Sequence, residues 1–359
     1  MLIDPTQYQQ ARMDAAVFPR HDRGLLEVAG ADRAKWLNNL VTNVVLTLQP
    51  GEGNYAFVVN VKGRTQFDLN ILVRPERLLL DIDRRWIETA AAFLNRYVVT
   101  EDAKIADLTD RTCRFAVIGA RAHEIAARLG FGNLTAMAWL QNTEGDLALS
   151  HSDAPPDTIA PQPSHADHPN PSVLMFRHDF CGVPGAEFIV FGEQAGSLCE
   201  LAMATAESFG ATPIDPAVAD VLRIEAGIPA SVQDIDEEVI PPETGQIERG
   251  ISYHKGCYLG QEVIERMRAH KVLARKLVGV RFDGSEIVGR LSPLFIDGVE
   301  VGRAMSGCPS PALGGAPLSL AYVKTAHAKP GVKLTSRTAA GDRAGEIVSL
   351  PISAEKAAT

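Results

Sequence analysis

The C-terminal third of the chain is a succession of short β-rich segments, and this pattern limits the possible fold most strongly. From Leu277 onward, glycine and proline separate the segments LVGVRF, VGRAMSG, LSLAYV, GVKLTS and AGEIVSL. Short strands at close spacing with such turns are typical of a small β-barrel or sandwich. We therefore predict a separate C-terminal β-barrel over residues 273–354.

The preceding part of the chain mixes strands with helices in no regular alternation, which predicts the α+β class. In the first hundred residues, strand-like composition predicts strands at 24–28, 54–61, 66–73 and 77–82. Helical spacing of apolar side chains predicts helices near 32–41 and 85–97. A second α+β unit is predicted from residue 106. The predicted domains are 1–105, 106–210 and 273–354, with 211–272 as a candidate completion of the first.

Residues 152–172 interrupt the second unit with six prolines and are expected to form an exposed loop or insertion. His151, His165 and His168 lie in or beside this segment. Their spacing matches no usual pattern of metal ligands, so we expect solvated side chains and predict no metal site.

Composition excludes several classes of protein. Lys and Arg number 35 against 44 Asp and Glu, and a net charge of −9 argues against a general nucleic-acid binder. No apolar stretch approaches the roughly 18 residues of a membrane span, and the first residues do not resemble a secretory signal. The five scattered cysteines include no CxxC pair, so we expect a reducing, cytoplasmic compartment.

The most informative motif is HKGCYLGQE, residues 254–262. Gly256 and Gly260 flank a Cys257–Tyr258 pair, and glycines let a backbone turn tightly or approach a ligand closely. Lys255 lies two residues before Cys257, and a nearby cation favours the reactive thiolate. Gln261 and Glu262 add an amide and a carboxylate. The alternative interpretation is a glycine-rich turn leading into a helix, with a small buried cysteine.

The segment KGCYLGQE resembles the K-G-C-Y-x-G-Q-E signature of the YgfZ family of folate-binding proteins, which is related to the aminomethyltransferase (T-protein) of the glycine cleavage system. LRIEAGIP, residues 222–229, resembles the upstream R-x-E-A-G-x-P block of the family. The segments GADRAKWLNNLVTN and RYVVTEDAKIADLT and the β-rich end also resemble the family, so the likeness covers nearly the whole chain outside the proline-rich insertion.

This resemblance implies a three-domain ring of the aminomethyltransferase type, with tetrahydrofolate or a derivative in a central channel. It implies a role in assembly or repair of iron–sulfur proteins, mainly 4Fe–4S enzymes, with A-type scaffold proteins and client enzymes as partners. The protein would be an accessory maturation factor rather than a turnover enzyme, in the cytoplasm or, in a eukaryote, the mitochondrial matrix. Cys257 is the candidate catalytic residue, and the candidate folate-binding residues are Asn60, Asp68, Arg223 and Glu225.

One departure from the transferases bears on the reaction. Asp68 in GRTQFDL matches one acidic position of the related motif G-x-x-x-D-D, whereas Phe67 occupies the other. The loss of one carboxylate argues against transferase chemistry, although a folate-dependent aminomethyltransferase or demethylase is the alternative function. Asp68 could equally be a solvated strand residue.

Arg223 and Glu225, two apart on a helix, do not share one face. A positive segment at residues 266–276 could receive the glutamyl tail of folate, an acidic partner or only solvent.

Overall fold

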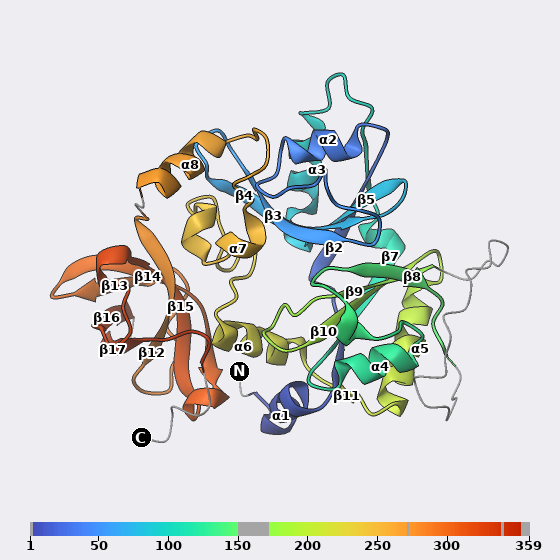
Figure 1. The fold of residues 1–359 in the computed structure, drawn as a ribbon. Helices are drawn as coiled ribbons and strands as arrows, with labels where there is room; N and C mark the ends of the chain where they lie inside the picture. The colour runs from blue at the N-terminus through green and yellow to red at the C-terminus, as the bar shows by residue number, and fades with distance from the viewer. Residues whose placement is uncertain (1–2, 150–171, 271–272, 339–340, 353–359) are drawn as a thin grey trace.

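The computed structural model describes residues 3–149, 172–270, 273–338 and 341–352. They form three units around the middle of the molecule, two of them α+β and the third a barrel (Figure 1). The predicted α+β ring with a C-terminal barrel is confirmed. The proline-rich segment 152–171, together with His151, His165 and His168, lies outside the described residues. No helix among the described residues is long and apolar enough to cross a membrane.

The first unit is a five-stranded antiparallel sheet covered on one face by two helices. Its strands, in spatial order, are β3 (Gly53–Val59), β4 (Thr65–Val73), β5 (Arg77–Asp83), β2 (Arg23–Ala29) and β6 (Lys104–Asp107). The covering helices are α2 (Arg33–Asn38) and α3 (Ile87–Asn95). Apolar side chains from one face of the sheet, among them Leu26, Phe67 and Ile71, pack with Leu37 and Phe93 of the helices. The hairpin predicted around Lys62–Arg64 joins β3 to β4.

The second unit is a six-stranded sheet whose strands come from distant parts of the chain. In spatial order they are β11 (Thr212–Pro213), β1 (Ala16–Pro19), β7 (Thr112–Ile118), β10 (Gly185–Phe191), β9 (Val173–Arg177) and β8 (Asn142–Gly145). Helices α4 (Ala122–Arg128) and α5 (Ala195–Ser208) pack on its outer face. Sheet membership does not follow the ranges 1–105 and 106–210, because β1 pairs with β7 whereas β6 pairs with β2.

The inner faces of the two sheets meet in a shared apolar core. Leu25, Phe57 and Leu79 from the first sheet contact Phe176 and Ile189 from the second. At about 25 cal/mol per Å² of apolar surface removed from water, this face-to-face burial is a main source of the free energy that holds the two units together. This packing holds the two sheets in fixed positions relative to each other, and both sheets contribute walls to the cavity described below.

The third unit is a closed barrel linked to the sheets by helices. Its strands, in spatial order, are β12 (Arg275–Phe282), β15 (Ala316–Lys324), β14 (Val299–Ser310), β13 (Pro293–Ile296), β16 (Lys333–Thr338) and β17 (Gly341–Val348). The remaining helices are α1 (Pro5–Met13), α6 (Pro216–Ala226), α7 (Ile247–Gly250) and α8 (Gln261–His270). The short 3-10 turns are η1 (Arg84–Trp86), η2 (Thr109–Arg111), η3 (Leu134–Ala136), η5 (Pro241–Thr244), η6 (Pro311–Leu313) and η7 (Thr325–His327).

Helix α6 lies between the second sheet and the barrel, and its sequence explains its ends (Figure 1). The Asp215 side chain accepts a hydrogen bond from the backbone of Ala217, with Pro216 at the first helical position. Gly227 ends the helix in a left-handed conformation with φ of 76°. Val221 and Leu222 pack in a core that also contains Tyr322 of the barrel. This helix carries Arg223 and Glu225.

Candidate functional site

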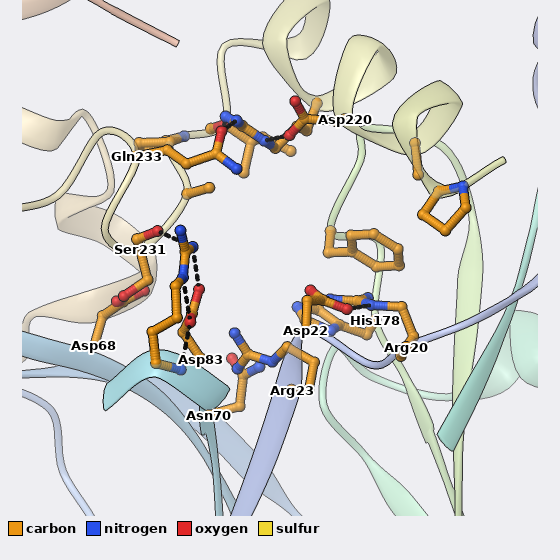
Figure 2. A pocket seen from close by; sticks show the side chains of 18 of the residues that line it. Arg20, Asp22, Arg23, Asp68, Asn70, Asp83, His178, Asp220, Ser231 and Gln233 are labelled. Carbon is orange, nitrogen blue, oxygen red and sulfur yellow. Dashed lines mark hydrogen bonds and ion pairs between the residues drawn. The ribbon is translucent and has the colours of Figure 1, made fainter. Parts of the chain in front are cut away.

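A cavity of about 520 Å³ lies between the two sheets and α6 (Figure 2). Its walls come from the connection between β1 and β2, from β3 and β4, from α6 and from the segment 228–233. The size falls within the roughly 300–1,000 Å³ of small-molecule sites. Of the predicted site residues, Asp68 and Arg223 line this cavity, and the other nine do not.

Asp68 lies on β4, and the alternation of side chains along a strand decides what it faces. Phe67, its neighbour, is buried on the opposite face and packs edge-on against Phe93, with ring centres 5.9 Å apart. The Tyr55 hydroxyl donates to Asp68 Oδ2 at 2.8 Å, whereas Oδ1 is buried without a hydrogen-bond partner among the described residues. Burial raises the pKa of Asp68. The Ser231 hydroxyl, which makes no hydrogen bond of its own by distance, lies near enough to Asp68 to oppose this rise in pKa. An unpaired buried oxygen is costly, so Oδ1 is open to this hydroxyl or to a donor on a ligand.

Arg249 also lines the cavity and was not singled out from the sequence. Its guanidinium stacks over the Trp139 ring, 4.2 Å from the ring centre, and lies 5.9 Å from the centre of the Tyr55 ring. Within the described part of the chain it makes no ion pair, and its Nε is buried without a partner. Burial lowers the pKa of Arg249. Such an unneutralised cation suits an acceptor or anionic group on a ligand.

The first sheet also carries a buried network of charges next to the cavity. Arg23 forms two hydrogen bonds to the Asp81 carboxylate, at 3.0 and 2.8 Å, and the guanidinium of Arg114 binds the same group. The Asn70 amide donates to Asp81 Oδ2 at 2.7 Å. Although burial alone would raise it, the two arginines hold the pKa of Asp81 well below its usual range. This network fixes Arg23 and Asn70 at the cavity.

His178 and Glu187 form a hydrogen-bonded pair beside this network. The Glu187 carboxylate contacts His178 Nδ1 at 2.6 Å and accepts from Arg20 Nη1 at 2.9 Å. Arg20 also holds Asp22 through two hydrogen bonds of 2.9 Å. Arg20 and His178 keep the pKa of Glu187 below its usual value against the opposing effect of burial. His178, Arg20 and Asp22 all line the cavity.

The two candidates on α6 lie in different surroundings. Arg223 lines the cavity, but its guanidinium is already held by Asp220 at 2.6 Å, Asp234 at 2.7 Å and Gln233 at 2.6 Å. Glu225 lies outside the cavity in the junction with α1 and the barrel, as the two-residue spacing on the helix requires.

The motif at 254–262 is docked on the first unit by three of its residues. The Lys255 ammonium donates to the carbonyls of Asn38, Val41 and Asn43 at 2.5, 2.6 and 2.8 Å. Burial lowers the pKa of Lys255 to about 7, while these carbonyls favour its protonated form. It also lies over the ring of the buried Tyr258, 5.0 Å from the ring centre. Its ammonium is thus engaged by the 38–43 turn.

Gly260 makes the closest approach between this motif and the β3–β4 hairpin. Its φ is +78°, and a Cβ atom placed there would lie 2.4 Å from the carbonyl oxygen of Asn60. Asn60 lies outside the cavity, and its side chain accepts hydrogen bonds from the backbone of Lys62 and Arg64 within the hairpin turn.

The remaining motif residues lie at or near the surface. Cys257, Gly256 and Glu262 are exposed and Gln261 is half-buried. A Cβ atom at Gly256 would contact nothing within 4 Å. The structure therefore separates the motif into docking residues and an exposed thiol that is not part of the cavity wall.

The basic segment at 266–276 is divided between several contacts. Arg275 forms an ion pair of 2.8 Å with Glu243, and Arg268 stacks over Tyr253. Lys271 lies outside the described residues. The described residues contain no group of three His, Cys, Asp or Glu side chains that could hold a metal ion.

The fold is that of a three-unit protein with a cavity at the meeting point of two sheets and a helix. Residues 6–152 match the family model described as the GCVT N-terminal domain, and residues 275–353 match the glycine cleavage T-protein C-terminal barrel domain. The chain therefore belongs to the superfamily of glycine cleavage T-proteins and related aminomethyltransferase-like proteins.

Known proteins agree with this placement. An aminomethyltransferase of Bacillus velezensis is 29% identical over 91% of this chain and 84% of its own length. One of Rubrobacter xylanophilus is 28% identical over 88% and 78%. A putative chloroplastic transferase of Arabidopsis thaliana is 26% identical over 79% of this chain and 59% of its own length. The crystal structure of aminomethyltransferase T from Bartonella henselae has the same fold, with a TM-score of 0.80 and 19% identity over 98% of this chain and 91% of that one.

Proposed function

We propose that this protein binds tetrahydrofolate or a derivative in the cavity and acts in assembly or repair of iron–sulfur proteins, mainly 4Fe–4S enzymes. The observation that carries the binding proposal is the buried, unpartnered Oδ1 of Asp68 in the cavity wall. A pterin presents several N–H donors and acceptors along one edge, and a buried carboxylate suits those donors.

The residues present fit this ligand at two further points. Arg249 offers an unneutralised guanidinium to the carbonyl or carboxylate groups of a folate. Tyr55 holds Asp68 in place through its hydroxyl. Tetrahydrofolate, when bound, supplies a carrier for one-carbon units. The chain's own residues would bind and orient it.

The part of the proposal that concerns iron–sulfur proteins rests on Cys257 and on the resemblance of its motif to the YgfZ signature. Lys255, Tyr258 and Gly260 hold the segment on the first unit, while the Cys257 thiol remains exposed. One cysteine cannot hold a cluster, which normally needs about four ligands. Cys257 would therefore act together with a partner, for which A-type scaffold proteins and client enzymes are the candidates.

A folate-dependent aminomethyltransferase or demethylase is the second candidate. The similarity to aminomethyltransferases over most of the chain favours it. Phe67 argues against it, because the position that carries a second aspartate in the transferase motif is filled here by a core side chain.

The test is deletion of the gene followed by two assays, the activity of a 4Fe–4S enzyme such as aconitase and the activity of glycine cleavage. The strain is complemented with wild type, Cys257→Ala and Asp68→Asn, and thermal unfolding checks that each variant folds. We expect a loss of 4Fe–4S enzyme activity that only the wild type restores. Normal 4Fe–4S enzymes with a lost one-carbon activity would transfer the proposal to the transferase.

A further inference from the structure

Two of the five cysteines lie together in the second unit, away from the cavity. Cys113 is on β7 and Cys199 is on α5, the helix that packs on the outer face of that sheet. Cys199 is fully buried in the core between helix and sheet, and the half-buried Cys113 packs against the same core. Both are free thiols. They are far apart in the sequence, so only the fold makes them neighbours.

The periodicity of each element places both thiols in the contact between them. On β7, Cys113 shares its face with Phe115, which belongs to the core under α5. On α5, Cys199 lies on the buried side in one row with the small residues Ala195 and Ala202. Small neighbours leave little between the helix and the strand, so the two sulfur atoms meet there.

The two thiols are joined by a hydrogen bond that gives them different properties. The Cys199 thiol donates to the Cys113 sulfur, which lowers the pKa of Cys113 and raises that of Cys199. The backbone of Arg114 also lowers the pKa of Cys113, whereas burial and the carboxylate of Glu200 oppose this effect. Cys113 is therefore the better nucleophile and is partly open to solvent, and Cys199 retains its proton beside it.

We propose that Cys113 and Cys199 are a peroxide-responsive thiol pair, which hydrogen peroxide or an organic hydroperoxide oxidises to a disulfide bond. The Cys113 thiolate attacks one peroxide oxygen, the O–O bond breaks, and Cys113 becomes a sulfenic acid. The Cys199 sulfur then attacks the Cys113 sulfur, so that the S–S bond forms, the S–O bond breaks and the oxygen leaves as water with the Cys199 proton. Overall the two thiols lose two hydrogen atoms, and hydrogen peroxide is reduced to two molecules of water.

The disulfide bond would fasten α5 to the strand that also supports the cavity. Because side chains alternate along β7, Arg114, next to Cys113, lies on the opposite face of the sheet, where its guanidinium binds Asp81. The pair lies directly behind this network of charges and uses none of the residues assigned to folate. The inference therefore does not depend on the proposed function.

The test treats the reduced, native full chain with hydrogen peroxide at neutral pH, then unfolds it, alkylates the remaining thiols and maps its peptides by mass spectrometry without reduction. Cleavage after Arg and Glu residues isolates Cys113 in peptide 112–114 and Cys199 in peptide 194–200. We expect these two peptides to be joined and two hydrogen atoms lighter than their sum. The buried Cys181 and Cys308 should remain as thiols.

Two variants test the separate roles of the sulfur atoms. Cys199→Ala should leave Cys113 as a sulfenic acid that dimedone traps, because the second sulfur is absent. Cys257→Ser is the matched control, since it removes the exposed thiol outside the pair, and it should form the joined peptides as the wild type does.

The opposite results would overturn the proposal. Oxidation of Cys257 while Cys113 and Cys199 remain thiols would exclude a responsive pair, and so would a disulfide between Cys113 and any other cysteine. Loss of the joined peptides in Cys257→Ser would show that the exposed thiol reacts with peroxide in place of Cys113. If Cys199→Ala does not fold, the peptide map of the wild type still decides, because it needs no variant. None of these results depends on folate binding, so the proposed function can fail without this inference, and the reverse.

Discussion

Substitution of Glu225 distinguishes the folate-binding role that the sequence predicts from the structural role that its contacts support. The carboxylate is buried and accepts hydrogen bonds from the Tyr8 hydroxyl at 2.6 Å, the Ser310 hydroxyl at 2.6 Å and the backbone of Ala312 at 3.0 Å. These donors belong to α1 and to the barrel. We predict that Glu225→Ala loosens the junction between α1, α6 and the barrel and leaves the cavity intact.

The expected loss of unfolding free energy follows from those three contacts. Each donor left without a partner costs about 1 kcal/mol or slightly more, which gives about 3–4 kcal/mol in all. With an unfolding entropy of about 2.1 cal/mol/K per residue, a loss of this size lowers Tm by about 4–5 °C if the three units unfold together. Glu225→Gln keeps the side-chain volume and one acceptor oxygen, so a smaller decrease is expected.

The assay is thermal unfolding of the three proteins together with a titration of tetrahydrofolate well below Tm. The structural role predicts a lower Tm for Glu225→Ala, an intermediate Tm for Glu225→Gln and wild-type affinity in both. A variant that unfolds at the wild-type temperature but loses affinity would refute this reasoning and place Glu225 at the ligand.

Three further predictions test other parts of the structure. Gly260→Ala should lower the unfolding free energy by about 2 kcal/mol or more, because of its positive φ and its contact with the β3–β4 hairpin, whereas Gly256→Ala should be neutral in the same denaturant titration. Asp81 has a depressed pKa, so its contribution to the unfolding free energy is present above about pH 4 and is lost as pH falls further. In an acid titration, the unfolding free energy of Asp81→Asn should therefore fall less steeply than that of the wild type. Alkylation of the native protein, followed by mass spectrometry, should modify Cys257 before Cys181, whose pKa burial raises to about 12; equal rates would contradict the exposure of Cys257.

Local patterns were enough to predict much of the fold. The strands predicted at 66–73 and 77–82 have strand-like composition and recognisable ends, and each is present within about one residue. Strand β1, Ala16–Pro19, was not predicted because it has only four residues and pairs with strands about 100 and 200 residues away. Its position depends on tertiary pairing and not on local propensity.

The site was predictable only where one residue type in one motif implied the chemistry. Asp68 was singled out from its motif and lines the cavity. Arg249 and His178 were not singled out. Arg249 is a candidate only because no carboxylate among the described residues neutralises it, and His178 only because Glu187 holds its ring. Those partners come from other strands and helices. Similarly, the sequence places Lys255 near Cys257, but the fold places its ammonium against carbonyls more than 200 residues earlier in the chain.

The measurement that tests the central claim most directly is a titration of tetrahydrofolate into wild type, Asp68→Asn and Cys257→Ala. In Asp68→Asn the amide oxygen can still accept the hydrogen bond from Tyr55, which places the amide nitrogen where Oδ1 was. That nitrogen is a donor, so it cannot accept a hydrogen bond from the N–H groups of a pterin. A hydrogen bond to a charged group contributes about 1.5–3 kcal/mol, so we predict affinity about ten- to a hundredfold weaker. Cys257→Ala should bind as wild type does. No saturable binding by wild type, or unchanged affinity in Asp68→Asn, would contradict the account.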